Sequence, residues 1–169
     1  MQHLKSGELV TLHKDGNYYV FLVLSPSAFF GCQWAFAFHK VHHSLPGVSD
    51  IGLAQPQGFV ALIDFIEPRR SNSIIRISKG IDPKPFLNFD LVKALIRMPG
   101  QDALWHIYDR HNSAILRKTS TLSRQEIDFP IWSGVHAYDT IHLIEAKWDP
   151  SILVSPAVSG QYPLPKNDG

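Results

Sequence analysis

The sequence predicts an α+β protein built mainly on antiparallel twisted sheet, with a short middle helix and one C-terminal helix. Two strand-like runs meet at a tight-turn signal near the start, and large and small side chains alternate along the next run. A regular strand–helix–strand repeat, which a parallel sheet needs, does not occur. The length of 169 residues favours one domain. We expect it over residues 1–155, followed by a Pro-rich, loosely ordered tail over 156–169.

The first forty residues give the clearest signal. Runs 8–13 and 17–24 are rich in Val, Leu, Tyr and Phe and flank the pair Asp15-Gly16. An Asp-Gly pair adopts the positive φ angles of a tight hairpin, so these runs predict two paired strands. Along 33–41, large aromatic residues alternate with small or polar ones, as in a strand that covers a core.

Later elements are predicted by shorter signals. Further strands are expected over 59–66, 74–77, 103–108 and 115–118. Residues 91–98 predict the middle helix, with Asp90 as its N-cap and Pro99-Gly100 at its end, and residues 123–126 predict one helical turn. Residues 139–147 predict the C-terminal helix, which Asp139 would cap and in which Ile141, Ile144 and Trp148 share one face.

Charge is segregated along the chain although the net charge is only +1. The net charge is −2 over residues 1–68, +7 over 69–124 and −4 over 125–149. The basic middle and the acidic C-terminal third either face each other within the fold or form separate contact surfaces. A near-neutral chain has no overall field to attract nucleic acid or an anionic membrane, so we expect neither as a partner.

Other features of the composition indicate the cellular compartment of the protein. The single cysteine, Cys32, excludes an intramolecular disulfide and is expected to be a small buried hydrophobe. The first residues lack the apolar segment of a signal peptide, and the longest apolar runs are shorter than a membrane span. We therefore expect a cytoplasmic protein.

Nine histidines are the most conspicuous source of possible chemistry, with His39, His42 and His43 clustered. A catalytic zinc site needs converging ligands and usually a carboxylate nearby, but no Asp or Glu lies between Asp15 and Asp50. Phosphate-binding glycine loops and the G-x-S-x-G nucleophile motif are also absent. We expect no metal, no cofactor and no catalytic residue, and hence a protein that is not an enzyme.

Two alternatives stay open. The first is a small His-dependent hydrolase or ribonuclease. The opening Gly7-Glu8-Leu9-Val10 resembles that of small SH3-like barrels, some of which are ribonucleases. The other is an RNA-contacting module, because the densest basic stretch contains Arg69, Arg70, Arg76 and Lys79.

Three groups of segments carry a family resemblance. They are 5–12 with 15–24, then the tryptophan strand 104–109, and finally 123–130 with Gly134, 141–145 and 148–150. In order and spacing these segments resemble the immunity proteins of bacterial polymorphic-toxin systems, in particular the family called immunity protein twenty-six.

The resemblance implies an α+β cytoplasmic protein that binds and neutralises a cognate toxin, with no catalysis of its own. Many such toxins are basic nucleases, which an acidic surface attracts. The acidic segment 125–149 is therefore the expected contact region. Its charged contacts would be Glu126, Asp128, Asp139 and Glu145, and its buried anchors Trp132, His136 and Tyr138.

Overall fold

The computed structural model describes residues 4–26, 32–96 and 98–148. They form two compact units. Unit 1 holds the described residues as far as Asn88 together with Gly134–Trp148, and unit 2 holds those of Phe89–Ser133. The single α+β domain expected over residues 1–155 stays a prediction, and the expected tail over 156–169 lies outside the described residues.

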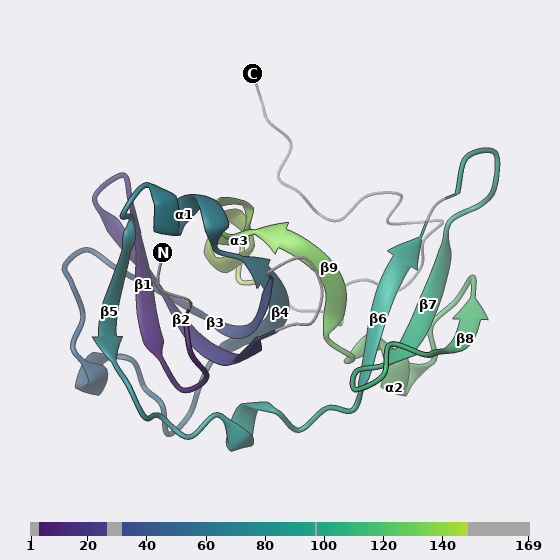
Figure 1. Ribbon diagram of the computed structural model, residues 1–169, viewed down its shortest axis with the longest axis horizontal. Helices are drawn as coiled ribbons and strands as arrows, with labels where there is room; N and C mark the ends of the chain where they lie inside the picture. The colour runs from purple at the N-terminus through teal and green to yellow at the C-terminus, as the bar shows by residue number, and fades with distance from the viewer. Residues whose placement is uncertain (1–3, 27–31, 97, 149–169) are drawn as a thin grey trace. The chain divides into compact units, whose positions relative to one another are not determined.

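Antiparallel strands predominate and helices are few, so the predicted α+β fold class is confirmed (Figure 1). Unit 1 contains β1 (Leu9–Lys14), β2 (Asn17–Pro26), β3 (Gln33–His42), η1 (Val48–Asp50), β4 (Gly58–Asp64), α1 (Ile66–Arg70), β5 (Ile74–Ser78), η2 (Lys84–Phe86) and α3 (Ala137–Glu145). Unit 2 contains β6 (Leu91–Ile96), β7 (Leu104–Asp109), β8 (Ile115–Thr119) and α2 (Arg124–Ile127). β9 (Ile131–His136) carries the chain from unit 2 into unit 1. None of the helices in the described ranges has the length and apolarity to cross a bilayer.

In the sheet of unit 1, strands β1 to β4 lie side by side in sequence order, and β5 pairs with the free edge of β1. The strand order is therefore β5-β1-β2-β3-β4. The predicted opening hairpin is confirmed: Lys14 pairs with Asn17 across a turn in which Asp15 and Gly16 have φ of 50° and 77°. Two consecutive positive φ angles match the right-handed twist of the strands that the turn joins. β5 then returns to pair antiparallel with β1.

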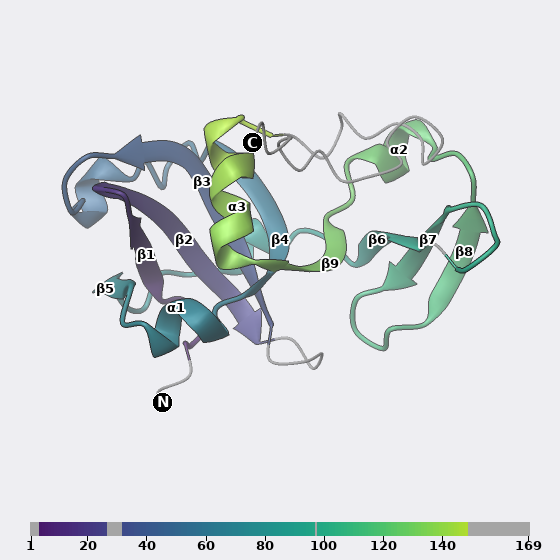
Figure 2. The ribbon, with the colours of Figure 1, turned by 90° about the horizontal axis from the view of Figure 1, so that it is seen from above.

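The two faces of β3 pack against different layers. The aromatic face lies toward η2, where the ring centroids of Phe36 and Phe86 are 4.9 Å apart. The other face presents Ala35 and Ala37, both fully buried. Helix α3 lies over β3 and β4 in Figure 2. Small side chains let a helix approach the sheet closely. The predicted alternation of large and small residues thus allows each face of β3 to pack against a different layer.

Helix α3 is where the sequence placed it, but its ends differ. Its inner side buries Ile141 and Ile144, and Trp148 after the helix is also buried, which confirms the predicted apolar face. The prediction of Asp139 as N-cap is wrong: the N-cap is His136 and the helix begins at Ala137. β9 runs directly into the helix, so the chain turns at the last strand residue.

Unit 2 contains a correction. Residues 91–98 were expected to form the middle helix, but Leu91–Ile96 is β6, paired residue for residue with β7 from Leu91↔Asp109 to Ile96↔Leu104. A short apolar run fits a helix or a strand equally well, and pairing with a distant strand decides. The short helices occur instead at α1 and α2. The second hairpin, β7–β8, and the helical turn at α2 are confirmed.

Candidate functional site

The acidic segment 125–149 is divided between the two units. Unit 2 contains the predicted contact residues Glu126, Asp128 and Trp132, and unit 1 contains His136, Tyr138, Asp139 and Glu145. The two groups therefore have to be considered separately.

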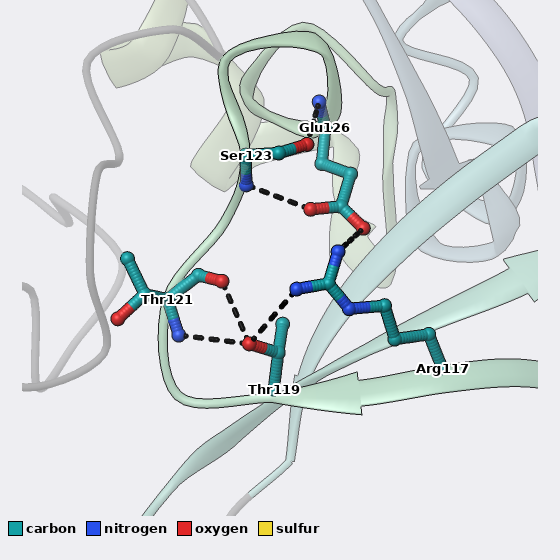
Figure 3. A network of polar contacts seen from close by, with 5 residues as sticks. All are labelled: Arg117, Thr119, Thr121, Ser123 and Glu126. Atoms are coloured by element: carbon teal, nitrogen blue, oxygen red, sulfur yellow. Dashed lines mark hydrogen bonds and ion pairs between the residues drawn. The ribbon is translucent and has the colours of Figure 1, made fainter.

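Glu126 is a structural residue of unit 2, buried to 7% exposure. Its carboxylate accepts hydrogen bonds from the Ser123 backbone N and from Arg117 Nη1, both at 2.7 Å (Figure 3). Ser123 Oγ in turn accepts from the Glu126 backbone N, which completes a capping box. Burial alone would raise the pKa of Glu126, but the hydrogen bonds from Ser123 and the Arg117 charge outweigh it and lower that pKa. The carboxylate is thus engaged inside the unit.

The other two predicted residues of unit 2 differ in exposure. Asp128 follows α2 and is exposed. Trp132 is half-buried and packs edge-on against Tyr108, with ring centroids 4.6 Å apart. Burial raises the pKa of Tyr108. Trp132 is therefore part of the packing of unit 2.

The predicted residues of unit 1 gather on one helix. Tyr138, His142 and Glu145 follow one another at spacings of four and three, so they form a stripe along α3. With Asp139 in the first turn, they make up the outer face of α3, which borders the buried Ile141 and lies away from the buried Ile144. The side chains of His142 and Glu145 are 44% and 47% exposed.

The N-terminal end of this outer face is held by the loop between α1 and β5 and by the end of β1. The Tyr138 hydroxyl donates to Ser73 Oγ at 3.2 Å and lies 3.3 Å from Ser71 Oγ. Lys14 Nζ lies 5.7 Å from the centroid of the Tyr138 ring, within the range of a cation–π contact. The ring is therefore fixed in position while half-exposed.

The C-terminal end is held by β2. The Tyr19 hydroxyl donates to Glu145 Oε1 at 2.6 Å. Burial, together with the hydrogen bond to Glu145 and its charge, raises the pKa of Tyr19 to about 12. Tyr19 is therefore a neutral donor at neutral pH. His142 Nδ1 lies 4.0 Å from Glu145 Oε2.

His136 stands at the start of α3 with a side chain 66% exposed. Its Nδ1 lies 3.8 Å from Asp64 Oδ2, while Asp64 Oδ1 accepts a hydrogen bond from the Ile66 backbone N at 2.7 Å. His136 thus contributes an exposed imidazole beside the outer face of α3, and not a buried anchor.

The clustered histidines, two in β3 and His43 just after it, have separate surroundings. His39 Nε2 donates to the Trp148 carbonyl at 2.9 Å, and His43 Nδ1 lies 2.8 Å from Asn17 Oδ1. His42 is buried, and burial lowers its pKa. Within residues 4–26, 32–96 and 98–148, no three His, Cys, Asp or Glu side chains are grouped to hold a metal ion. Cys32 is buried, as predicted.

The basic stretch proposed for RNA is partly engaged. Arg76 Nε lies 3.0 Å from Glu8 Oε1, and Arg69 Nε donates to the Phe65 carbonyl at 3.2 Å. Arg70 and Lys79 are exposed. The stretch therefore presents fewer solvated charges than its sequence indicates.

Sequence reasoning missed one residue of the outer face, His142, and two residues that hold it, Lys14 and Tyr19. His142 lies one helical turn from Tyr138, so the periodicity of the helix could have found it. Lys14 and Tyr19 come from the opening hairpin, more than a hundred residues earlier, and no sequence signal links them to α3. Comparisons with protein-family models, with curated proteins and with solved structures find no match to the chain.

Proposed function

We propose that this chain is a binding protein of the immunity type, which neutralises a cognate toxin in the cytoplasm by forming a tight stoichiometric complex and has no catalytic activity of its own. The observation that supports this best is the outer face of α3. It combines an aromatic ring, two carboxylates and an imidazole on one rigid helix.

Two side chains of this face, Tyr138 and Glu145, are held in place before any partner arrives. Tyr138 is bonded to Ser73, and Glu145 accepts from Tyr19 at 2.6 Å. A side chain that is already ordered loses less conformational entropy on binding. A half-exposed tyrosine is a favoured binding anchor, and the carboxylates of Asp139 and Glu145 would steer a basic partner.

A histidine-dependent hydrolase or ribonuclease has less support. His39 and His43 each hydrogen-bond a different structural neighbour, Trp148 and Asn17. His42 is buried and its pKa is lowered, so it does not offer an accessible acid–base group.

The test uses the protein domain encoded immediately upstream of this chain as the toxin candidate. We expect co-expression to restore growth to cells that produce the domain, and the purified pair to elute as a 1:1 complex. Tyr138→Ala should weaken the complex by about tenfold or more, the effect of losing a binding anchor.

Glu67→Ala is the matched control, because Glu67 is an exposed carboxylate of unit 1 on α1 and not on α3. It should leave affinity unchanged, and thermal melting should show that both variants fold. If the upstream domain neither binds the chain nor is neutralised by it, the proposal is wrong. If Tyr138→Ala binds as well as the control, the outer face of α3 is not the contact.

A further inference from the structure

A pocket of about 360 Å³ opens in unit 1, bordered by β3, the loop after η1 and the residues that follow α3. Small-molecule sites have volumes of about 300–1,000 Å³, so the pocket is large enough for a small ligand. Phe38 and Ile51 are the apolar residues of its lining, and both are nearly fully buried, so each presents only an edge to the pocket. Its other walls carry polar side chains, Lys40, Lys147, Gln55 and Gln57 among them.

The charges that face the pocket favour an anion. Asp50 is its one carboxylate, and Asp50 Oδ2 already accepts a hydrogen bond from the Gly47 backbone N at 2.8 Å. Lys40 Nζ donates to the Asp50 backbone carbonyl at 3.0 Å, which leaves two of its three N–H groups for a ligand. Lys147 is an exposed residue, and among the described residues its side chain has no ion pair.

The backbone of Lys147 supplies an independent observation. α3 ends in a Schellman motif, in which Lys147 N donates to the Ile144 carbonyl and Trp148 N to the Leu143 carbonyl. Lys147 occupies the left-handed position of this motif, with φ of 50°. Glycine is the residue usually found there, because a Cβ strains this conformation. Lys147 thus keeps a non-glycine side chain at a left-handed position and lines the pocket, which is consistent with a role for that side chain.

We propose that this pocket binds a small phosphate monoester, with the phosphate held by the ammonium groups of Lys40 and Lys147 and the organic part against Phe38 and Ile51. Two lysines match the two negative charges of a phosphate monoester, and lysine binds phosphate as a point charge. The amides of Gln55 and Gln57 offer additional donors to phosphate oxygens. This site is separate in purpose from the outer face of α3 and does not depend on toxin binding.

The test is a titration of the full chain with phenyl phosphate. Calorimetry and the NMR chemical shifts of the backbone amides measure the binding. We expect saturable binding that weakens with added salt. Inorganic phosphate lacks the phenyl ring, and phenol lacks the phosphate group. Each should therefore bind at least about tenfold more weakly than phenyl phosphate, because it loses either the apolar or the charged contact.

Lys147→Gly separates binding from folding. It should raise the melting temperature, because it relieves the left-handed strain, and at the same time weaken phenyl phosphate binding at least about tenfold. Lys40→Met should weaken binding without the rise in melting temperature. Ser113→Gly is the matched control: Ser113 also has a positive φ, 61°, but belongs to unit 2 and does not line the pocket. It should raise the melting temperature and leave binding unchanged. The proposal is wrong if phenyl phosphate does not bind, or if phenol binds as tightly. It is also wrong if phenyl phosphate binding is unchanged in both lysine variants.

Discussion

β1 of unit 1 and β8 of unit 2 are both antiparallel strands, but their side chains have opposite environments. Leu9–Leu12 are all fully buried, whereas Ile115–Lys118 are all exposed. β1 lies between β2 and β5, while β8 pairs with β7 and ends the strand order of the described chain. Burial of a strand is therefore set by the layers and strands around it as much as by its own apolar content.

The same difference distinguishes how the two units are held together. In unit 1, aromatic and aliphatic side chains fill the space on both faces of the sheet, for example where Phe21 meets Phe65 edge-on at 5.4 Å. In unit 2, a polar network around Glu126 joins β8 to α2 (Figure 3). The sheet core of unit 1 should thus be sensitive to lost volume, and the contact between β8 and α2 to lost charge.

The largest effect is expected in the core of unit 1. Phe21 is fully buried, so Phe21→Ala should lower the free energy of unfolding by about 3–5 kcal/mol, the cost of a large core cavity. Urea unfolding followed by circular dichroism measures it. Leu116→Ala, at a residue 57% exposed on β8, is the comparison and should change stability by less than about 0.5 kcal/mol. Equal losses from the two changes would contradict the contrast between the buried sheet of unit 1 and the exposed strand β8.

A smaller effect is expected in unit 2. Glu126→Gln removes the ion pair with Arg117 and weakens the capping box, and should cost about 1–2 kcal/mol. Asp128→Asn, at an exposed carboxylate two residues away, should cost almost nothing.

The pH dependence of stability is a sharper test of the contribution of Glu126. The pKa of Glu126 is lowered in the folded state, so its contribution is present above the ordinary glutamate pKa and is lost as pH falls through the folded value. Hydrogen exchange of unit 2 amides at acidic pH should show this loss in the native chain and not in Glu126→Gln. An unchanged acid response would mean that Glu126 does not stabilise the unit.

The smallest effect concerns unit 1 at alkaline pH. The folded pKa of Tyr19 is about 12 against an ordinary value of 10.0, so its contribution is complete below pH 10 and is lost as pH rises toward 12. Ultraviolet titration of tyrosinate should detect Tyr19 as a late-titrating tyrosine, in addition to Tyr108, whose pKa is also raised. Tyr19→Phe should remove that titration and cost about 1 kcal/mol at neutral pH, the value of one hydrogen bond. Glu145→Gln should lower the pKa of Tyr19, and a titration that it does not alter would exclude the Tyr19–Glu145 contact.

The sequence by itself determined the elements whose signals are local. Asp15-Gly16 specifies a hairpin because its two residues accept positive φ, and Ser123 with Glu126 specifies a helix start because the two side chains cap each other's backbone. The stripe of Ile141, Ile144 and Trp148 predicted α3 because helical periodicity is visible within ten residues.

Tertiary structure decided everything that depends on a distant partner. Residues 91–96 became a strand because β7 pairs with them, and β5 returned to β1 across sixty residues. The same applies to the candidate site. Periodicity could place Tyr138 and Glu145 on one helix, but only the folded chain could bring Tyr19 to Glu145 and withdraw Glu126 into the capping box of α2. Backbone dihedrals and periodicity act between neighbours in sequence, whereas strand pairing and ion pairs form between groups that only folding brings together.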